Sequence, residues 1–185
     1  MSTISDLLRN YLQLRKNVDR ICRDIATAFG PHLACRAGCD GCCRQITLFP
    51  VEADALAAGL AALPEEQAGH IRNRVRTAPP DGPCPLLEDG LCLLYDHRPI
   101  ICRTHGLPLL LETDGSRQVD FCPLNFQGLP SLPGNAVIDL DRLNEALAAV
   151  NSLFVAELAD GAQREKERVS IAEALIHPLT STQPE

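Results

Sequence analysis

The sequence predicts a small single domain of the α+β class, in which helices at both ends surround short β-hairpins and a cysteine-rich core. Three observations favour this class: helical apolar periodicity near both ends, two Asp-Gly dipeptides between apolar runs, and cysteines gathered in the middle. We expect residues 1–185 to form one unit, with a core over 30–123, helical flanks over 1–29 and 137–177, and a flexible tail over 178–185.

The first 29 residues have the pattern of an amphipathic helix. Apolar side chains recur at gaps of mostly three and four from Ile4 to Phe29, which predicts a helix over this stretch. Gly30 and Pro31 follow it and are typical of a helix end. Cys22 lies beside the apolar stripe, so we interpret it as a small core residue rather than a ligand.

Shorter elements are expected in the middle of the chain. Residues 45–49 alternate enough to predict a strand, and the alanine-rich stretch 51–63 predicts a helix. Pro64 opens a further helix that runs to about Thr77. Asp89-Gly90 and Asp114-Gly115 each stand between two apolar runs and predict two β-hairpins.

The C-terminal part is predicted to be mainly helical. Residues 123–136 are rich in Pro, Gly and Asn and are expected to form a loop. A helix over 140–158 follows, capped at Asp139 or Asp141 and stopped at Asp160-Gly161. A short helix near 170–176 completes the predicted elements.

Composition and charge exclude several classes of function. The net charge of −7, without a run of Lys or Arg, argues against nucleic-acid binding. No stretch reaches the roughly 20 apolar residues of a membrane span, and the N-terminus lacks the pattern of a signal peptide, so we expect a cytoplasmic protein. Cytosolic thiols are kept reduced, so the nine cysteines favour metal binding over disulfides.

Eight of the cysteines form the candidate metal-binding set. Four of them fall within nine residues, where tight turns let neighbouring thiolates converge on one ion. The candidate ligands are Cys35, Cys39, Cys42, Cys43, Cys84, Cys92, Cys102 and Cys122.

The cofactor is either zinc or an iron–sulfur cluster, because sets of four cysteines serve both. Eight thiolates suffice for two four-thiolate sites, or for one such site with four thiolates left over. Cys42 and Cys43 are adjacent and their side chains tend to diverge, so either they belong to different centres or one of them supports a centre without ligating it. The spacing of Cys35, Cys39 and Cys42 also matches that of radical-SAM enzymes, but the strand–helix alternation of a β/α barrel is missing.

Four further residues near the second half of the cysteine set are candidates for supporting the metal or contacting a substrate. Arginines beside a four-thiolate centre would offset its negative charge, and a histidine close to Cys102 could ligate or donate a hydrogen bond. These residues are Tyr95, Arg98, Arg103 and His105.

The cysteine pattern and its surroundings resemble the CxxCxxCC, or YkgJ-like, family, which is described as zinc- or iron-chelating. The likeness covers about residues 35–122 and includes the opening cluster, Cys84-Pro85, Gly90-Leu91-Cys92 and Arg98-Pro99 with Cys102-Arg103. Cys122-Pro123 matches the trailing cysteine, while the first gap holds three residues where the family label implies two. The resemblance implies metal chelation and no single reaction.

Three functions remain open from the sequence. The first is a metal-binding protein whose thiolates hold zinc or an iron–sulfur cluster; the second is an iron–sulfur-dependent enzyme, redox or group-transferring, with its substrate near the cluster. The third is a sensor that acts through a protein partner of unknown identity. Neither a GxGxxG nor a P-loop motif is present, so no nucleotide site is predicted.

Overall fold

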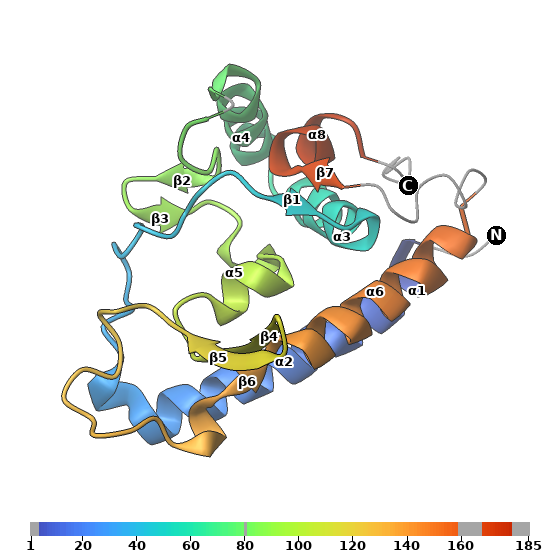
Figure 1. Cartoon of the computed structure of the whole chain (residues 1–185). Helices are drawn as coiled ribbons and strands as arrows, with labels where there is room; N and C mark the ends of the chain where they lie inside the picture. Colours follow the sequence, from blue (N-terminus) through green and yellow to red (C-terminus); the bar gives the residue numbers. More distant parts are fainter. Residues whose placement is uncertain (1–3, 80, 159–167, 179–185) are drawn as a thin grey trace.

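Two long helices from opposite ends of the chain lie side by side. The computed structural model describes residues 4–79, 81–158 and 168–178. The predicted N-terminal helix is present as α1 (Ile4–Leu7) and α2 (Arg9–Phe29), separated by Leu8. Tyr11, Val18 and Ile25 are buried at seven-residue intervals, so they share one face of α2. That face packs against α6 (Leu140–Ala156), which runs alongside α2 in Figure 1.

A second body of short helices sits above this pair (Figure 1). Helix α3 (Pro50–Ala61) is buried almost all around, because its many alanines let neighbouring elements approach closely. It contacts α6 on one side and α8 (Ile171–Ile176) on the other. Helix α4 (Glu65–Thr77) also packs on α8, so the C-terminal helix closes this part of the fold.

Both predicted hairpins are confirmed. Strands β2 (Leu87–Glu88) and β3 (Leu91–Cys92) pair antiparallel, as do β4 (Leu109–Thr113) and β5 (Ser116–Asp120). The turn residues Asp89, Gly90, Asp114 and Gly115 all have positive φ, between 48° and 75°. Two consecutive residues with positive φ form the turn type that matches the twist of paired strands, which explains the Asp-Gly choice.

Two strand pairings join segments far apart in the sequence. Strand β1 (Thr47–Leu48), shorter than the predicted 45–49, pairs antiparallel with β7 (Val169–Ser170). Strand β6 (Ile138–Asp139) pairs parallel with β4 just before α6 begins. The Asp139 carboxylate then accepts a 3.0 Å hydrogen bond from the backbone N–H of Arg142, as the predicted N-cap of this helix.

The core is built chiefly from Leu, Ile, Val and Ala in three clusters, as the low aromatic content predicts. One cluster lies among α3, α4 and α8, a second among α2, α3 and α6, and a third under the 107–138 region. Tyr11, Phe126 and Phe154 are the buried aromatic exceptions. The α+β class is thereby confirmed.

The remaining elements are short. Among the helices that the structure describes, none combines the length and the apolar character needed to cross a membrane. The predicted helix stop at Asp160-Gly161 and most of the predicted tail lie outside the described residues. The short helices are η1 (Gly30–His32), η2 (Tyr95–His97), α5 (Ile100–Thr104) and η3 (Gly134–Ala136).

Candidate metal centre

Four separate segments carry the eight candidate cysteines to one side of the molecule. The loop between η1 and β1 passes beside the β2–β3 hairpin, with α5 to its right and the end of β5 below (Figure 1). All nine cysteines of the chain are free thiols. The arrangement therefore brings together residues that lie up to 87 positions apart.

The first cluster is folded into two tight turns. The backbone N–H of Cys39 donates to the carbonyl of Arg36 at 2.9 Å, and that of Cys43 donates to the carbonyl of Asp40 at 2.8 Å. Gly38 has φ +88°, a conformation that side-chain-bearing residues rarely adopt. These turns explain why glycine separates the cysteines, and they leave Cys35, Cys39 and Cys42 exposed.

The β2–β3 hairpin is fixed to this cluster at both of its ends. At its base, the N–H of Cys84 donates to the carbonyl of Cys43 at 3.1 Å. At its turn, Gly90 approaches Gly38 so closely that a Cβ on Gly90 would lie 3.1 Å from the Gly38 Cα. The hairpin therefore holds Cys84 and Cys92 beside the opening cluster.

Four half-buried thiols form what we call the inner group: Cys43, Cys84, Cys92 and Cys102. They lie close enough for the charge of one to raise the pKa of the next, since Cys84, Cys92 and Cys43 all act on Cys102. Burial is the larger cause. Burial and the neighbouring charges together raise the pKa of Cys84 to about 11 and that of Cys102 to about 12. Thiols with such pKa values stay protonated at neutral pH unless a cation replaces the proton.

The other four thiols, Cys35, Cys39, Cys42 and Cys122, form the outer group. Burial is the main cause that raises the pKa values of Cys35 and Cys42. The charges of Cys39 and Cys122 raise the pKa of Cys35 further, and those of Cys43 and, to a smaller extent, Cys35 raise that of Cys42. Cys35 and Cys122 meet across Gly106, where an added Cβ would lie 3.0 Å from the Cys35 Sγ and 3.4 Å from the Cys122 Cβ. Cys42 and Cys43 share a side-chain hydrogen bond, which links the two groups.

Neither group is closed around a point. In the described part of the chain, no three His, Cys, Asp or Glu side chains converge tightly enough to ligate one ion as they stand. The structure thus gathers the eight thiols into one neighbourhood, in which Cys42 and Cys43 join the inner and outer groups. Their assignment as ligands stays a prediction.

Asn125 supports the outer group, although no sequence pattern predicts this role. Its side chain is 1% exposed, and the amide nitrogen donates to the Cys35 Sγ at 3.3 Å and to the Gly106 carbonyl at 2.7 Å. The amide oxygen accepts a 2.8 Å hydrogen bond from the Ala34 N–H. No local signal marks this residue, because an asparagine in a Pro- and Gly-rich loop is usually a turn former.

Arg98 is the arginine that faces the inner group. Burial raises the pKa values of Cys43, Cys92 and Cys102, and the positive charge of Arg98 lowers them in part. The guanidinium carbon lies 3.5 Å from the centre of the exposed Tyr95 ring, and Nε donates to the Tyr95 carbonyl at 2.9 Å. Tyr95 therefore holds Arg98 in place by stacking and by its backbone.

The other two candidates are placed differently. Arg103 has a side chain only 6% exposed; it pairs with Asp19 of α2 at 2.6 Å and donates to the Arg98 carbonyl at 2.7 Å. It anchors the segment that carries Arg98. His105 is exposed at the end of α5. Cys22 is half-buried among core residues and donates to the Arg103 carbonyl at 3.5 Å, in agreement with its interpretation as a core thiol.

Comparison with known proteins gives one match. Residues 34–123 match the family model CxxCxxCC, whose description is "Putative zinc- or iron-chelating domain". The matched range includes all eight candidate ligands and excludes Cys22. Neither the curated proteins nor the solved structures contain a match to this chain.

Proposed function

Because residues 34–123 belong to the CxxCxxCC family of zinc- or iron-chelating domains, we propose that this chain binds metal at two centres, one in each group of four thiols. The observation that carries the proposal is the proximity of the thiols within two sets, Cys43 with Cys84, Cys92 and Cys102, and Cys35 with Cys39 and Cys122. We assign Cys42, which is hydrogen-bonded to Cys43 and also lies near Cys35, to the second set as its fourth ligand. Four thiolates complete the coordination of a structural zinc ion, and four also hold an iron–sulfur cluster.

The chemistry of the donors supports chelation. Burial raises the pKa values of the inner thiols and so disfavours their thiolate form. A bound cation would offset this effect, because it stabilises the thiolates. The positive charge of Arg98 would offset part of the net negative charge of a four-thiolate centre. Rotation of the exposed side chains of Cys35, Cys39 and Cys42 in the turn-rich loop would bring them together with the half-buried Cys122. We expect this protein to act in a reducing compartment such as the cytoplasm.

The test combines metal analysis with three serine variants. Zinc, iron and acid-labile sulfide are measured on anaerobically purified wild type, Cys102→Ser, Cys122→Ser and the control Cys22→Ser. We expect each ligand variant to lose about half of the metal, since each removes one thiolate from one closed centre, while Cys22→Ser keeps it all. Full metal in both ligand variants, or an equal loss in Cys22→Ser, would overturn the proposal.

An iron–sulfur-dependent enzyme is the second candidate function. It is favoured by the exposure of Cys35, Cys39 and Cys42, because a solvent-open centre is accessible to a substrate. Iron with sulfide and broad absorbance near about 400 nm, as expected of a cysteine-ligated cluster, would support this candidate. Zinc without sulfide would eliminate it. In the enzyme, Arg98→Ala and His105→Ala should keep the cluster and lose activity.

A further inference from the structure

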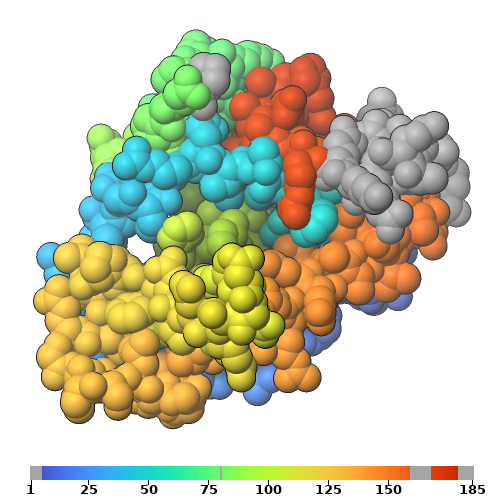
Figure 2. Space-filling model, in the orientation of Figure 1, coloured from blue at the N-terminus to red at the C-terminus, as the bar shows by residue number. Residues whose placement is uncertain are grey.

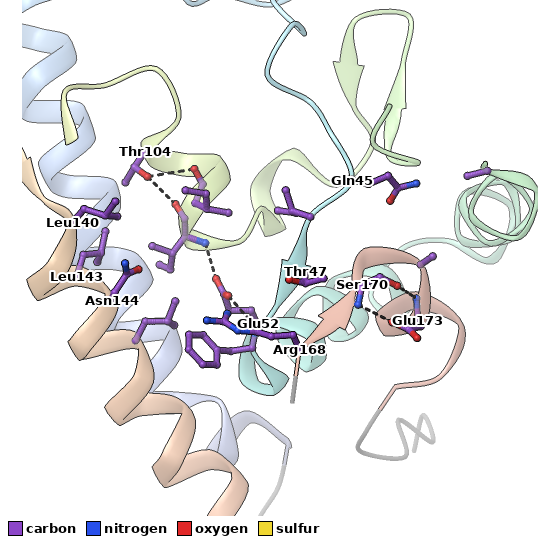
Figure 3. A pocket seen from close by; sticks show the side chains of 17 residues that line it. Gln45, Thr47, Glu52, Thr104, Leu140, Leu143, Asn144, Arg168, Ser170 and Glu173 are labelled. Atoms are coloured by element: carbon purple, nitrogen blue, oxygen red, sulfur yellow. Dashed lines mark hydrogen bonds between the residues drawn. The ribbon is translucent and has the colours of Figure 1, made fainter. Parts of the chain in front are cut away.

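A cavity of about 840 Å³ lies on the far side of α5 from the inner thiols. It opens where the N-terminus of α3, α5 and the first turns of α6 face β7 and the start of α8 (Figure 3). Figure 2 shows this face hollowed between the cyan residues around β1 and the yellow β4–β5 hairpin, with the green residues of α5 recessed between them. Its volume is in the range of small-molecule sites.

The walls of the cavity are mainly apolar. Residues from six elements (β1, α3, α5, α6, β7 and α8) contribute, so the surface is continuous rather than a single helix face. An apolar wall with few polar groups is typical of sites for ligands that have a hydrocarbon body. The principal apolar contributors are Phe49, Ile100, Ile101, Leu140, Leu143 and Leu147.

The acidic side chain at the floor is already engaged. Glu52 is 4% exposed, and its Oε1 accepts a 3.0 Å hydrogen bond from the Ile100 N–H. Its Oε2 accepts a 3.4 Å hydrogen bond from the Phe49 N–H (Figure 3). Glu52 therefore joins α3 to α5 and is not a free acceptor for a cationic ligand.

The cation beside the cavity is Arg168. Its guanidinium carbon lies 3.5 Å from the centre of the Phe49 ring, so the side chain is held over the apolar wall while it remains exposed. No carboxylate among the described residues forms an ion pair with Arg168. Its planar N–H donors suit bidentate recognition of a carboxylate.

From these features we propose that the cavity binds a small amphipathic carboxylate, with its hydrocarbon chain along the walls and its anionic group on Arg168. The amide of Asn144, which lines the cavity from α6, supplies a further polar group near the apolar wall. Two acidic residues line the cavity, and both are already hydrogen-bonded: Glu52 at the floor to the Ile100 N–H, and Glu173 to the Ser170 N–H at 2.8 Å. A cationic ligand would therefore meet the repulsion of Arg168 without a free carboxylate to offset it.

The site is separate from the thiols. Helix α5 turns Ile100, Ile101 and Thr104 toward the cavity, while none of the cysteines lines it. Binding of the carboxylate therefore requires no metal ligation, and metal content can serve as an independent check that a variant is folded.

The test uses octanoate and octan-1-ol, titrated by calorimetry into the full metal-loaded chain. Arg168→Gln should weaken octanoate binding at least tenfold and leave octanol binding unchanged, because only the charged contact is removed. Arg142→Gln, on the exposed side of α6, is the matched control and should bind octanoate as wild type does. Ala172→Phe, which fills the cavity from α8, should weaken both ligands.

Three outcomes would overturn the proposal: no octanoate binding to wild type, equal affinity in Arg168→Gln, or tighter binding of octylamine than of octanoate. If Ala172→Phe loses its metal and fails to fold, the comparison of octanoate binding by Arg168→Gln and Arg142→Gln still tests the proposal.

Discussion

The side-chain amide nitrogen of Asn125 lies 3.3 Å from the Sγ of Cys35, 90 residues earlier in the chain. The same nitrogen donates to the Gly106 carbonyl, and the amide oxygen accepts from the Ala34 N–H. One buried amide thus fixes the start of the cysteine loop against the α5–β4 connection. It also presents a donor to a thiolate, which is how protein groups commonly orient metal-binding sulfur.

We expect Asn125→Asp to destabilise the protein by roughly 2–4 kcal/mol, because a nearly isosteric acid removes the donors and buries a charge beside a carbonyl and a sulfur. Metal should be lost from the outer group first. Chemical denaturation and metal analysis measure both effects. Gln127→Glu is the matched amide-to-acid control in an exposed side chain. Equal behaviour of the two variants would contradict the role given to Asn125.

Arg103→Met should cost about 3 kcal/mol of unfolding free energy, since it leaves Asp19 without its partner and two carbonyls without charged donors. Arg9 offers a matched control, because it also pairs with an aspartate but its side chain is 71% exposed. Arg9→Met should change stability by no more than about 0.5 kcal/mol. Denaturant unfolding of both variants measures the difference, and similar losses would show that burial of Arg103 is unimportant.

The sequence predicts the individual helices and hairpins of this fold better than it predicts which distant segments pair with one another. The helix over 9–29 follows from local apolar periodicity and that over 65–77 from its start signal at Pro64. Both hairpins follow from Asp-Gly turns, whose conformation those residues adopt readily. The pairing of Thr47 with Ser170 was not predictable, because two-residue strands carry no alternation that selects a partner. Such pairings are decided by the packing of the helices around them.

At the candidate site, too, the sequence predicts which residues take part but not how they are grouped. The eight cysteines are evident from their spacing, whereas the assignment of Cys42 and Cys43 to different centres stays a prediction. Their grouping depends on the contact of the β2–β3 turn with Gly38 and of Gly106 with Cys35, which are tertiary contacts. Asn125 and the Asp19 partner of Arg103 were missed for the same reason.

Gly59→Ala should destabilise the protein although alanine is the better helix former. A Cβ at Gly59 would lie 2.3 Å from the Cγ and 2.8 Å from the Cβ of His97, so the η2 segment must move. Overpacking of this kind costs about 1–3 kcal/mol. Thermal unfolding and metal content measure the effect on a segment that lies between Cys92 and Cys102.

Gly69→Ala in α4 provides the control, because its Cβ would meet only the Glu65 Oε1, at 4.0 Å. This variant should gain about 0.5–1 kcal/mol from helix propensity. Stabilisation of both variants by the same amount would mean that His97 yields freely and that the contact is unimportant.

Metal removal should loosen the thiol segments before it unfolds the helices. No residue from 31 to 46 is buried, whereas α2, α3 and α6 contribute to extensive apolar clusters. Hydrogen exchange after chelation should therefore accelerate in 35–44 and 84–95 while the centres of α2 and α6 stay protected. Unchanged exchange in 35–44 would argue that metal does not order this loop, and global loss of protection would make the metal essential to the whole fold.

The pH dependence of stability should reveal the buried Glu52. Burial raises the pKa of this carboxyl above its ordinary value of 4.5, and the N–H groups of Ile100 and Phe49 oppose the shift only in part. A raised pKa means that the folded state favours the neutral acid. The resulting stabilisation is fully present below the unfolded-state pKa and is lost as pH rises through the folded-state value.

We therefore expect wild type to lose stability relative to Glu52→Gln as pH is raised from about pH 4 to pH 8, because the amide cannot ionise. Urea unfolding of both proteins across this range measures the gap, with Glu66→Gln on the exposed first turn of α4 as control for the substitution. If wild type instead gains stability relative to Glu52→Gln as pH is raised, the two backbone donors and the charge of Arg168 outweigh the effect of burial on the Glu52 pKa. Glu52 would then be a carboxylate held by its hydrogen bonds, and the polarity of the cavity floor would be that of a fixed negative charge.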